Sequence, residues 1–560
     1  MRTFFKVTII WLLVTLTIFS ASKDPVHSKN GMVVSADKYA TQVGVEILKQ
    51  GGNAVDAAVA VGFALAVTFP GAGNIGGGGF MVIHLNDGRN VTIDYREKAP
   101  AKAHRDMFLD KYGNFDINLS TEGWTSSGVP GSVAGLIYIL EKYGTLKLAQ
   151  VIQPAIELAE NGFKMEYHFA STLNYFHDEF SKIPSTKKIF VKDSGNFEEG
   201  ELFVQKDLAK TLKIIRDKGK DGFYKGEIAK LIAKQSSENG GLITEEDLAN
   251  YQPVERVPVT GNYRGYDIIS MGPSSSGGVV LIEALNILEN FNFSKNDWGS
   301  SKYVHTVCEA LKFVYADRAE FLGDEDFYQV PKKWLTSKEY AKTIFNKIGN
   351  EATPSKQISH GVQIKESDQT THYSVVDKFG NAVSTTTTIN SWFGNKIVVD
   401  GAGFFMNNEM DDFSSKPGSP NQFGLLGGEA NSIQPNKRML SAMTPTIVLK
   451  DGKPFMVIGS PGGSTIITTV LQVILNAIDF GMDIQEAIDA PRFHHQWLPD
   501  QIDYEKFGLS QDVMENLKSR GQNIGVERSL GRAEGIIIDS KKNIFFGATD
   551  SRANGLALGY

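Results

Sequence analysis

The sequence is organised around Glu366-Ser-Asp-Gln-Thr-Thr-His-Tyr-Ser-Val-Val-Asp377. Two β-prone runs, Tyr373–Asp377 and Ala382–Ile389, lie in and after this stretch. Between them, Lys378-Phe-Gly-Asn381 places Gly and Asn where a tight turn needs positive φ. The sequence therefore predicts a β-hairpin that begins just after Thr370.

The second strand of this hairpin is rich in hydroxyl groups. Strand alternation puts Ser384, Thr386 and Thr388 on one face and Thr385 and Thr387 on the other. Threonine favours strands for packing reasons, so the run alone does not identify a catalytic site. It does place several hydroxyls on one face of the hairpin, beside Thr370.

Longer motifs occur in a fixed order around this hairpin. They are Gln369-Thr-Thr-His-Tyr-Ser374, Asn390, Asn407-Asn-Glu-Met-Asp-Asp-Phe413 and Gly459-Ser-Pro-Gly-Gly-Ser464. Together they closely resemble the γ-glutamyltransferases, which belong to the N-terminal nucleophile hydrolases. The resemblance covers nearly the whole chain after the first thirty or so residues.

The resemblance implies an α+β fold, a four-layer αββα sandwich, in one intertwined globular unit. The precursor would cut itself at the Gln369–Thr370 bond into a large subunit, 23–369, and a small subunit, 370–560. A threonine hydroxyl is a weak nucleophile until a base takes its proton. An N-terminal threonine carries its own base, because its α-amine has an unperturbed pKa near ~8. The precursor is therefore expected to be inactive, and residues 350–369 are expected to be freed by cleavage.

The same resemblance assigns the site residues. It makes Thr370 the nucleophile, Thr388 a hydroxyl in contact with it, and the backbone N–H groups of Gly462 and Gly463 the oxyanion donors. The amino-acid end of the substrate needs a cation for its carboxylate and acceptors for its ammonium group. The resemblance assigns the carboxylate to Arg96 and Ser441, and the ammonium group to Asn390, Glu409 and Asp412.

The sequence departs from the family at one position. The family commonly has two adjacent serines at the carboxylate, whereas this chain has Ser441-Ala442. One hydrogen-bond donor is missing, which would weaken substrate binding or broaden specificity toward acyl groups that are not amino acids, as in the similar cephalosporin acylases. A lid-like loop spans Pro417 to Pro435, with Phe423 where some relatives have tyrosine.

Composition narrows the class of protein. The chain has 560 residues, a net charge of −7 and no long basic run, which argues against nucleic acid as a partner. Its single cysteine, Cys308, cannot form an intrachain disulfide and lies in an apolar run. Residues 1–22 are typical of a secretory signal peptide, which predicts a secreted or periplasmic protein; an uncleaved membrane anchor is the alternative.

Two other signals compete with this interpretation. Gly71-Ala-Gly-Asn-Ile-Gly-Gly-Gly-Gly79 contains the G-x-G-x-x-G of a dinucleotide site, but a helix-like run precedes it and four glycines cannot open a stable helix. A tight turn near the active site is expected instead. His494-His495 suggests a metal, but adjacent strand residues point to opposite sides, so structural packing is expected. We expect no metal and no cofactor.

The sequence thus predicts a self-processing γ-glutamyltransferase that cleaves glutathione and related compounds. It would pass the glutamyl group to water, amino acids or dipeptides through a threonine ester. The alternatives are another N-terminal nucleophile amidase, such as a glutaryl or cephalosporin acylase, and a non-catalytic nucleotide-binding or scaffold protein. Residues 131–260 are expected to be mainly helical, and further helices are expected over 279–325 and Ile466–Ile478. After Thr370, the expected strands are Tyr373–Asp377, Ala382–Ile389, Thr446–Leu449, Phe455–Ile458, Gly535–Ile538 and Asn543–Ala548.

Overall fold

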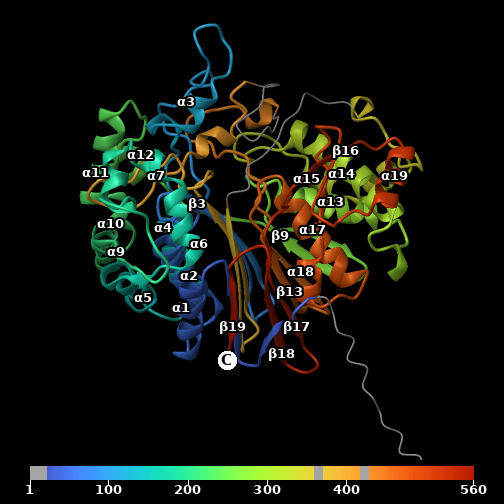
Figure 1. The fold of residues 1–560 in the computed structure, drawn as a ribbon, viewed down its shortest axis with the longest axis horizontal. Coiled ribbons are helices and arrows are strands. Elements are labelled where there is room, and N and C mark those ends of the chain that lie inside the picture. Colours follow the sequence, from blue (N-terminus) through green and yellow to red (C-terminus); the bar gives the residue numbers. More distant parts are fainter. Residues whose placement is uncertain (1–21, 359–369, 417–427) are drawn as a thin grey trace, which may run out of the picture.

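The computed structural model describes residues 22–358, 370–416 and 428–560. Two seven-stranded sheets lie face to face at its centre (Figure 1). The first has the order β1 (Val26–Ser28), β18 (Ile544–Thr549), β17 (Glu534–Asp539), β13 (Lys453–Gly459), β12 (Thr446–Lys450), β9 (Tyr266–Ser270) and β8 (Val259–Tyr263). The second has the order β19 (Leu556–Gly559), β2 (Gly31–Ser35), β10 (Thr371–Asp377), β11 (Ala382–Thr388), β3 (Gly78–His84), β4 (Asn90–Asp94) and β7 (Val254–Arg256).

Helices cover the outer face of each sheet (Figure 1). Beside the second sheet are α1 (Lys38–Lys49), α2 (Ala54–Thr68), α4 (Ser132–Tyr143), α5 (Leu148–Asn161), α9 (Lys206–Lys218), α10 (Lys220–Tyr224), α11 (Glu227–Glu238) and α12 (Glu245–Ala249). Beside the first are α13 (Gly277–Leu288), α14 (Ser301–Phe321), α16 (Lys338–Phe345), α17 (Thr465–Ile478) and α18 (Ile484–Asp489). The four layers confirm the expected αββα sandwich. The prediction that 131–260 is mainly helical is confirmed, although 254–256 and 259–263 at its end are strands.

The remaining elements are short and lie at the periphery of the sandwich. They are α3 (Ile117–Thr121), α6 (Tyr167–Tyr175), α7 (His177–Phe180), α8 (Pro184–Phe190), α15 (Lys332–Leu335), α19 (Gln511–Ser519), and the strands β5 (Phe163–Lys164), β6 (Leu202–Phe203), β14 (Phe493–His494), β15 (Ile502–Tyr504) and β16 (Ile524–Glu527).

Side-chain alternation along the strands divides the core into three layers. In β2, Val33 packs with the helices, whereas Met32 and Val34 pack between the two sheets. In β13, Val457 packs between the sheets and Ile458 packs against the other helical layer. Because both faces of each sheet are buried, the period of two fixes which side chains can reach the space between the sheets.

The hairpin predicted from the sequence is present at the centre of the second sheet. β10 and β11 pair antiparallel, with Thr371 opposite Thr387 and Val376 opposite Ala382. Gly380 in the turn has φ +98. β2 and β3 pair with the outer edges of the hairpin, so both of its strands are hydrogen-bonded on both sides.

The glycines of the Gly71–Gly79 run allow neighbouring backbone segments to pack closely. The run follows α2, whose residues are all buried and which Asn53 caps, and it leads into strand β3, so it has the wrong context for a dinucleotide site. A Cβ at Gly76 would lie 2.1 Å from the Phe405 carbonyl oxygen, and one at Gly77 would lie 2.2 Å from that of Thr388. The expected tight turn near the hydroxyl-rich strand is confirmed.

Among the described residues, no helix combines the length and the apolarity needed to cross a bilayer.

A buried acidic pair in the helical layer of the first sheet predicts a pH effect on stability. Burial first, and then the charge of Asp317, raise the pKa of Glu283 well above its usual value. The unfolded chain loses this proton near pH ~4.3 and the folded chain keeps it, so stability is expected to fall as pH rises above that value. We expect Glu283→Gln to flatten this decline and to raise stability at pH 8 by about 1–3 kcal/mol. Melting midpoints of both proteins between pH 5 and 8 test this, and parallel curves would contradict it.

Candidate active site

The hairpin places the predicted nucleophile beside its predicted partner. The β10–β11 register pairs Thr371 with Thr387, and one further step along it sets Thr370 opposite Thr388. Thr388 also pairs with Gly78 on β3. Both threonines belong to the strand face that looks into the space between the two sheets. Residue 370 begins the described part of the chain after the gap that contains Gln369.

A row of polar side chains continues along this face below the two threonines. The two ring nitrogens of His372 lie 2.9 Å from Thr386 Oγ1 and 3.0 Å from Ser374 Oγ. Burial lowers the pKa of His372 to about 3, so its imidazole is neutral at neutral pH. A Cβ at Gly459 would lie 2.3 Å from that ring, so only glycine allows β13 to approach there. This row confirms the hydroxyl-bearing face, and its central histidine had no role assigned from the sequence.

Asn390 links the threonine pair to the acidic motif. Its backbone N–H donates to Thr388 Oγ1 at 2.9 Å, and its side-chain Nδ2 donates to the Asn408 carbonyl at 2.9 Å. Asn390 has φ +70, a conformation that asparagine tolerates better than most residues. The segment that leaves β11 therefore turns sharply and connects the nucleophile to Glu409 and the residues that follow it.

The predicted substrate-binding residues meet in a buried charge cluster. Arg96, which is fully buried, donates from Nη1 to Glu409 and from Nη2 to Asp412. Glu97 Oε2 lies 3.6 Å from Arg96 Nη1, and Arg96 Nε donates to the Met439 carbonyl at 3.4 Å. Residues far apart in sequence are brought together as expected. The guanidinium differs from an open carboxylate receptor, because two carboxylates already engage it.

This cluster holds more acidic than basic groups. Burial raises the pKa of Glu409 well above its usual value and also raises the pKa values of Glu97 and Asp412, whereas Arg96 opposes these shifts. Burial alone would lower the pKa of Arg96, but the charges of Glu409 and Asp412 raise it. One guanidinium surrounded by three buried carboxyls leaves a site in which an additional ammonium group would be stabilised.

Ser441 lies at the edge of the same cluster. The preceding residue, Leu440, accepts a hydrogen bond from Arg96 Nη2 at 3.5 Å through its carbonyl. Ser441 Oγ accepts from the backbone N–H of Met443 at 3.1 Å. The next side chain is Ala442, which is 6% exposed and offers no hydroxyl. The structure therefore supplies a single serine hydroxyl at this position.

The two candidate oxyanion glycines form the turn that leads into α17. Gly462 has φ +131 and Gly463 has φ +55. The Gly462 carbonyl accepts from Thr465 Oγ1 at 2.7 Å, which fixes the turn. Within the described ranges, the N–H groups of these two glycines donate no recorded hydrogen bond. Two backbone donors at a helix N-terminus suit a developing negative charge.

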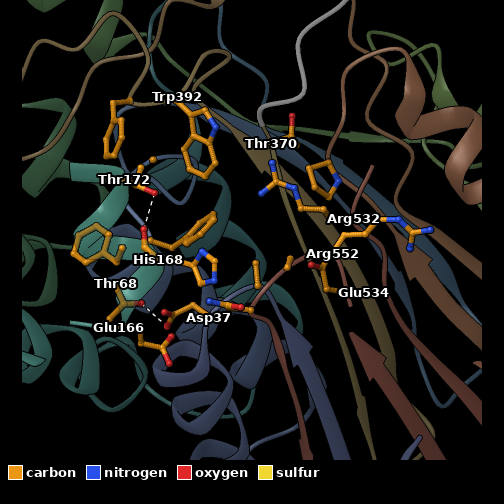
Figure 2. A pocket seen from close by; sticks show the side chains of 18 residues that line it. Asp37, Thr68, Glu166, His168, Thr172, Thr370, Trp392, Arg532, Glu534 and Arg552 are labelled. Carbon is orange, nitrogen blue, oxygen red and sulfur yellow. Dashed lines mark hydrogen bonds between the residues drawn. The ribbon is translucent and has the colours of Figure 1, made fainter. Parts of the chain in front are cut away.

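A separate pocket of about 180 Å³ opens at Thr370 (Figure 2). It lies between the end of α2, α6, the chain after β11, the loop before β17 and the chain before β19. Its described lining includes Asp37, Thr68, Phe69, Gly71, Glu166, His168, Thr172, Thr370, Trp392, Phe393, Pro461, Arg532, Glu534 and Arg552. None of the residues of the Arg96 cluster is among them. The pocket at Thr370 is therefore distinct from the Arg96 cluster.

The remaining predictions from the sequence concern Cys308, His494 and three segments of the chain. Cys308 is fully buried, and burial raises the pKa of its thiol, as expected of an inert core cysteine. His494 contacts Thr468 Oγ1 at 2.9 Å and Gln496 Oε1 at 2.8 Å, which fits the packing role predicted for it. Gln369, residues 1–21 of the signal segment and positions 417–427 of the lid-like loop, with Phe423, lie outside the described residues.

Comparison with known proteins agrees with this architecture. The family model for γ-glutamyltranspeptidase matches residues 40–560. A glutathione hydrolase proenzyme of Escherichia coli (strain K12) is 52% identical over 540 residues, which cover 96% of this chain and 93% of that protein. A cephalosporin acylase from Bacillus halodurans superposes with a TM-score of 0.85 at 28% identity, covering 97% of this chain and 98% of that one. A chain of Helicobacter pylori γ-glutamyltranspeptidase is 53% identical and superposes with a TM-score of 0.58. The match covers 59% of this chain and 96% of the Helicobacter pylori chain.

A sandwich of two sheets between helical layers, with a threonine at the start of a central strand, defines an enzyme of the N-terminal nucleophile hydrolase type. Within that type, the chain belongs to the γ-glutamyltranspeptidase family.

Proposed function

We propose that this chain is a γ-glutamyltransferase that is made as a precursor and cleaves its own Gln369–Thr370 bond. The Thr370 hydroxyl would attack the Gln369 carbonyl carbon, and the peptide would shift from the threonine nitrogen to its oxygen. Water would then cleave that ester, leaving a carboxyl on Gln369 and a free amine on Thr370. The name "proenzyme" carried by the Escherichia coli relative supports this order of events.

The freed amine would then serve as the base for catalysis. It takes the proton of the Thr370 hydroxyl as that oxygen bonds to the γ-carbonyl carbon of the substrate. The negative charge on the carbonyl oxygen is stabilised by the N–H groups of Gly462 and Gly463. When the carbon–nitrogen bond breaks, the departing amine receives the proton, and a γ-glutamyl ester of Thr370 remains. Thr388, which the register sets opposite Thr370, would orient the nucleophile through its hydroxyl.

The ester is resolved by a second nucleophile. Water or the neutral amine of an amino acid or dipeptide attacks the ester carbon, and the bond to Thr370 Oγ breaks. The proton lost by the nucleophile returns to that oxygen. Hydrolysis of glutathione thus gives glutamate and the dipeptide Cys-Gly, whereas transfer to an amine gives a new γ-glutamyl compound. The two chains left by cleavage, 23–369 and 370–560, would form a heterodimer.

The observation that carries the substrate assignment is the buried cluster around Arg96. The guanidinium, with Ser441, would bind the α-carboxylate of the glutamyl group, and Glu409, Asp412 and Asn390 would accept hydrogen bonds from its ammonium. Buried polar groups left without partners are costly, so a site of this kind rejects acyl chains that lack the ammonium. If the expected signal segment acts as one, the protein would be periplasmic or secreted.

We expect γ-glutamyl p-nitroanilide to be cleaved with a kcat/KM at least about 100-fold higher than that of glutaryl p-nitroanilide. The two anilides differ only by the α-amino group, so the ratio measures recognition of the ammonium. The single serine at Ser441-Ala442 and the similarity to a cephalosporin acylase make glutaryl acylase activity the second candidate. A reversed ratio would establish that second candidate, and no cleavage of either anilide would contradict both.

A further inference from the structure

The pocket that opens at Thr370 has no role in the proposed binding of the glutamyl group. A substrate whose α-carboxylate is held at the Arg96 cluster and whose γ-carbonyl lies at Thr370 must direct its amine side elsewhere. The pocket of about 180 Å³ opens at that threonine and shares none of its described lining with the cluster. It is smaller than the ~300–1,000 Å³ typical of drug-sized ligands, and thus suited to an amino acid or a dipeptide.

Arg532 is the cation available in this pocket. Among the described residues it has no recorded carboxylate partner, and its guanidinium carbon lies 5.7 Å from the Trp392 ring centre. The other arginine there, Arg552, is occupied by Glu505 and by Asp550, with a distance of 2.9 Å to the latter. A half-buried guanidinium without an acidic partner is suited to bind a carboxylate with paired hydrogen bonds.

The acidic groups that line the described part of the pocket form no ion pair with Arg532. Burial, and then the charge of Asp550, raise the pKa of Glu534 well above its usual value, whereas the charge of Arg532 opposes this shift. Glu166 pairs with Lys38 at 2.7 Å. Asp37 accepts hydrogen bonds from the Ala40 N–H at 2.9 Å and from the Thr68 hydroxyl at 2.7 Å. Glu166 and Asp37 thus have partners of their own, and among the described residues no carboxylate of the pocket forms an ion pair with Arg532.

The loop that carries Arg532 is fixed against the oxyanion turn. The backbone N–H of Arg532 donates to Ser460 Oγ at 3.0 Å, one residue before the Pro461-Gly462 segment. Gly531 has φ +71, and a Cβ there would lie 2.4 Å from Thr469 Oγ1. Only glycine permits this approach. The backbone at Arg532 is therefore held at a fixed position relative to the proposed oxyanion donors.

Trp392 forms the opposite wall and is equally constrained. A Cβ at Gly71 would lie 2.2 Å from its indole ring, so the first glycine of the Gly71–Gly79 run makes room for it. Phe69 packs edge-on against the same ring at 5.6 Å. A fixed aromatic wall beside an arginine offers apolar contact for a short amine-bearing chain and a charge for its far end.

We infer that the Trp392–Arg532 pocket binds the carboxylate end of the amine partner of the reaction, with Arg532 as its cation. The ligand is an amino acid or a dipeptide with a free carboxylate, either departing from the donor or arriving as acceptor. This assignment rests on the proposed γ-glutamyl transfer at Thr370. Arg532 thereby becomes a specificity-determining residue for the side of the substrate that the Arg96 cluster does not contact.

The test compares pairs of compounds that differ only in that carboxylate. As acceptors we would use Gly-Gly and Gly-Gly amide with a γ-glutamyl anilide donor. As donors we would use γ-Glu-Cys-Gly and its C-terminal amide, with hydrolysis as the readout. In the wild-type enzyme we expect the free carboxylate to raise kcat/KM by about 10- to 100-fold. A preference only among acceptors assigns the pocket to the arriving amine, and one only among donors assigns it to the departing amine.

Substitutions then identify the cation. Arg532→Gln is expected to reduce the carboxylate-to-amide ratio to within about threefold of one, and Arg532→Lys to retain part of it. The ratio is taken within each variant, so altered processing or acylation cancels. Arg89→Gln, an exposed arginine paired with Asp87 on a distant turn, is the matched control and should keep the wild-type ratio.

Wild-type enzyme that cleaves the γ-glutamyl anilide but does not distinguish carboxylate from amide in either pair would overturn this inference and leave the proposed function intact. A preference that persists in Arg532→Gln would also overturn it, since another cation would then bind the carboxylate. Absence of any cleavage of the anilide would contradict the proposed function itself.

Discussion

Thr370→Ala is expected to leave the chain whole and inactive. Purified wild-type protein should separate into pieces of roughly 38 and 21 kDa, scaled from chain length, the smaller beginning at Thr370. The variant should remain a single chain and show no turnover of a γ-glutamyl anilide. The reason is that one oxygen is proposed to serve both steps, so its loss removes self-cleavage and catalysis together. Intact mass spectrometry and a chromogenic assay on the same preparations measure both.

Two neighbouring substitutions show whether the hydroxyl itself is responsible. Thr370→Ser keeps the oxygen and is expected to process and to regain measurable activity. Thr371→Ser changes a buried threonine on the opposite face of β10, and it should process like the wild type. A wild-type protein that stays a single active chain would sink the mechanism, because Thr370 could then have no free amine.

Much of the fold could be predicted because its strongest signals are local. The alternation in Tyr373–Asp377 and Ala382–Ile389 and the Gly-Asn turn gave the central hairpin within one or two residues of its observed ends. The end of the helical region was missed at Val254–Arg256. That strand has three residues and forms the edge of its sheet beside β4, so its pairing depends on a partner about 160 residues away. No short-range pattern records such a contact.

The candidate site was also predictable from the sequence only in part. The resemblance to the γ-glutamyltransferases predicted that Thr370, Thr388 and the residues of the Arg96 cluster belong to one site. It could not show that Glu409 and Asp412 close on the Arg96 guanidinium, because that geometry depends on how the segment after β11 folds back over β4. Trp392 and Arg532 carried no sequence signal at all. Their proximity arises from Gly71 and Gly531, whose missing side chains permit two close approaches between distant segments.

Arg96→Gln is expected to lower kcat/KM for a γ-glutamyl anilide by about 10²- to 10³-fold and to lower the melting temperature. Removing one partner of a buried, hydrogen-bonded charge cluster costs about 3–5 kcal/mol, because the remaining charges lose their compensation. In this chain the remaining groups are Glu409, Asp412 and Glu97. Arg216→Gln removes an arginine that makes a two-point contact with Asp217 at the surface, and it should change neither quantity appreciably.

The loss in Arg96→Gln combines a structural effect with a binding effect, and a second substitution separates them. Glu409→Gln in the same chain removes one of the carboxylates that Arg96 had compensated, so the melting temperature should recover toward the wild-type value. The kcat/KM should stay low, because no cation has been restored for the substrate α-carboxylate and because Glu409 is also one of the proposed acceptors for its ammonium. If activity returns together with stability, Arg96 maintains the cluster but does not bind the substrate. The α-carboxylate would then have to be bound by backbone donors and Ser441, with Arg96 acting only through the position of Glu409 and Asp412.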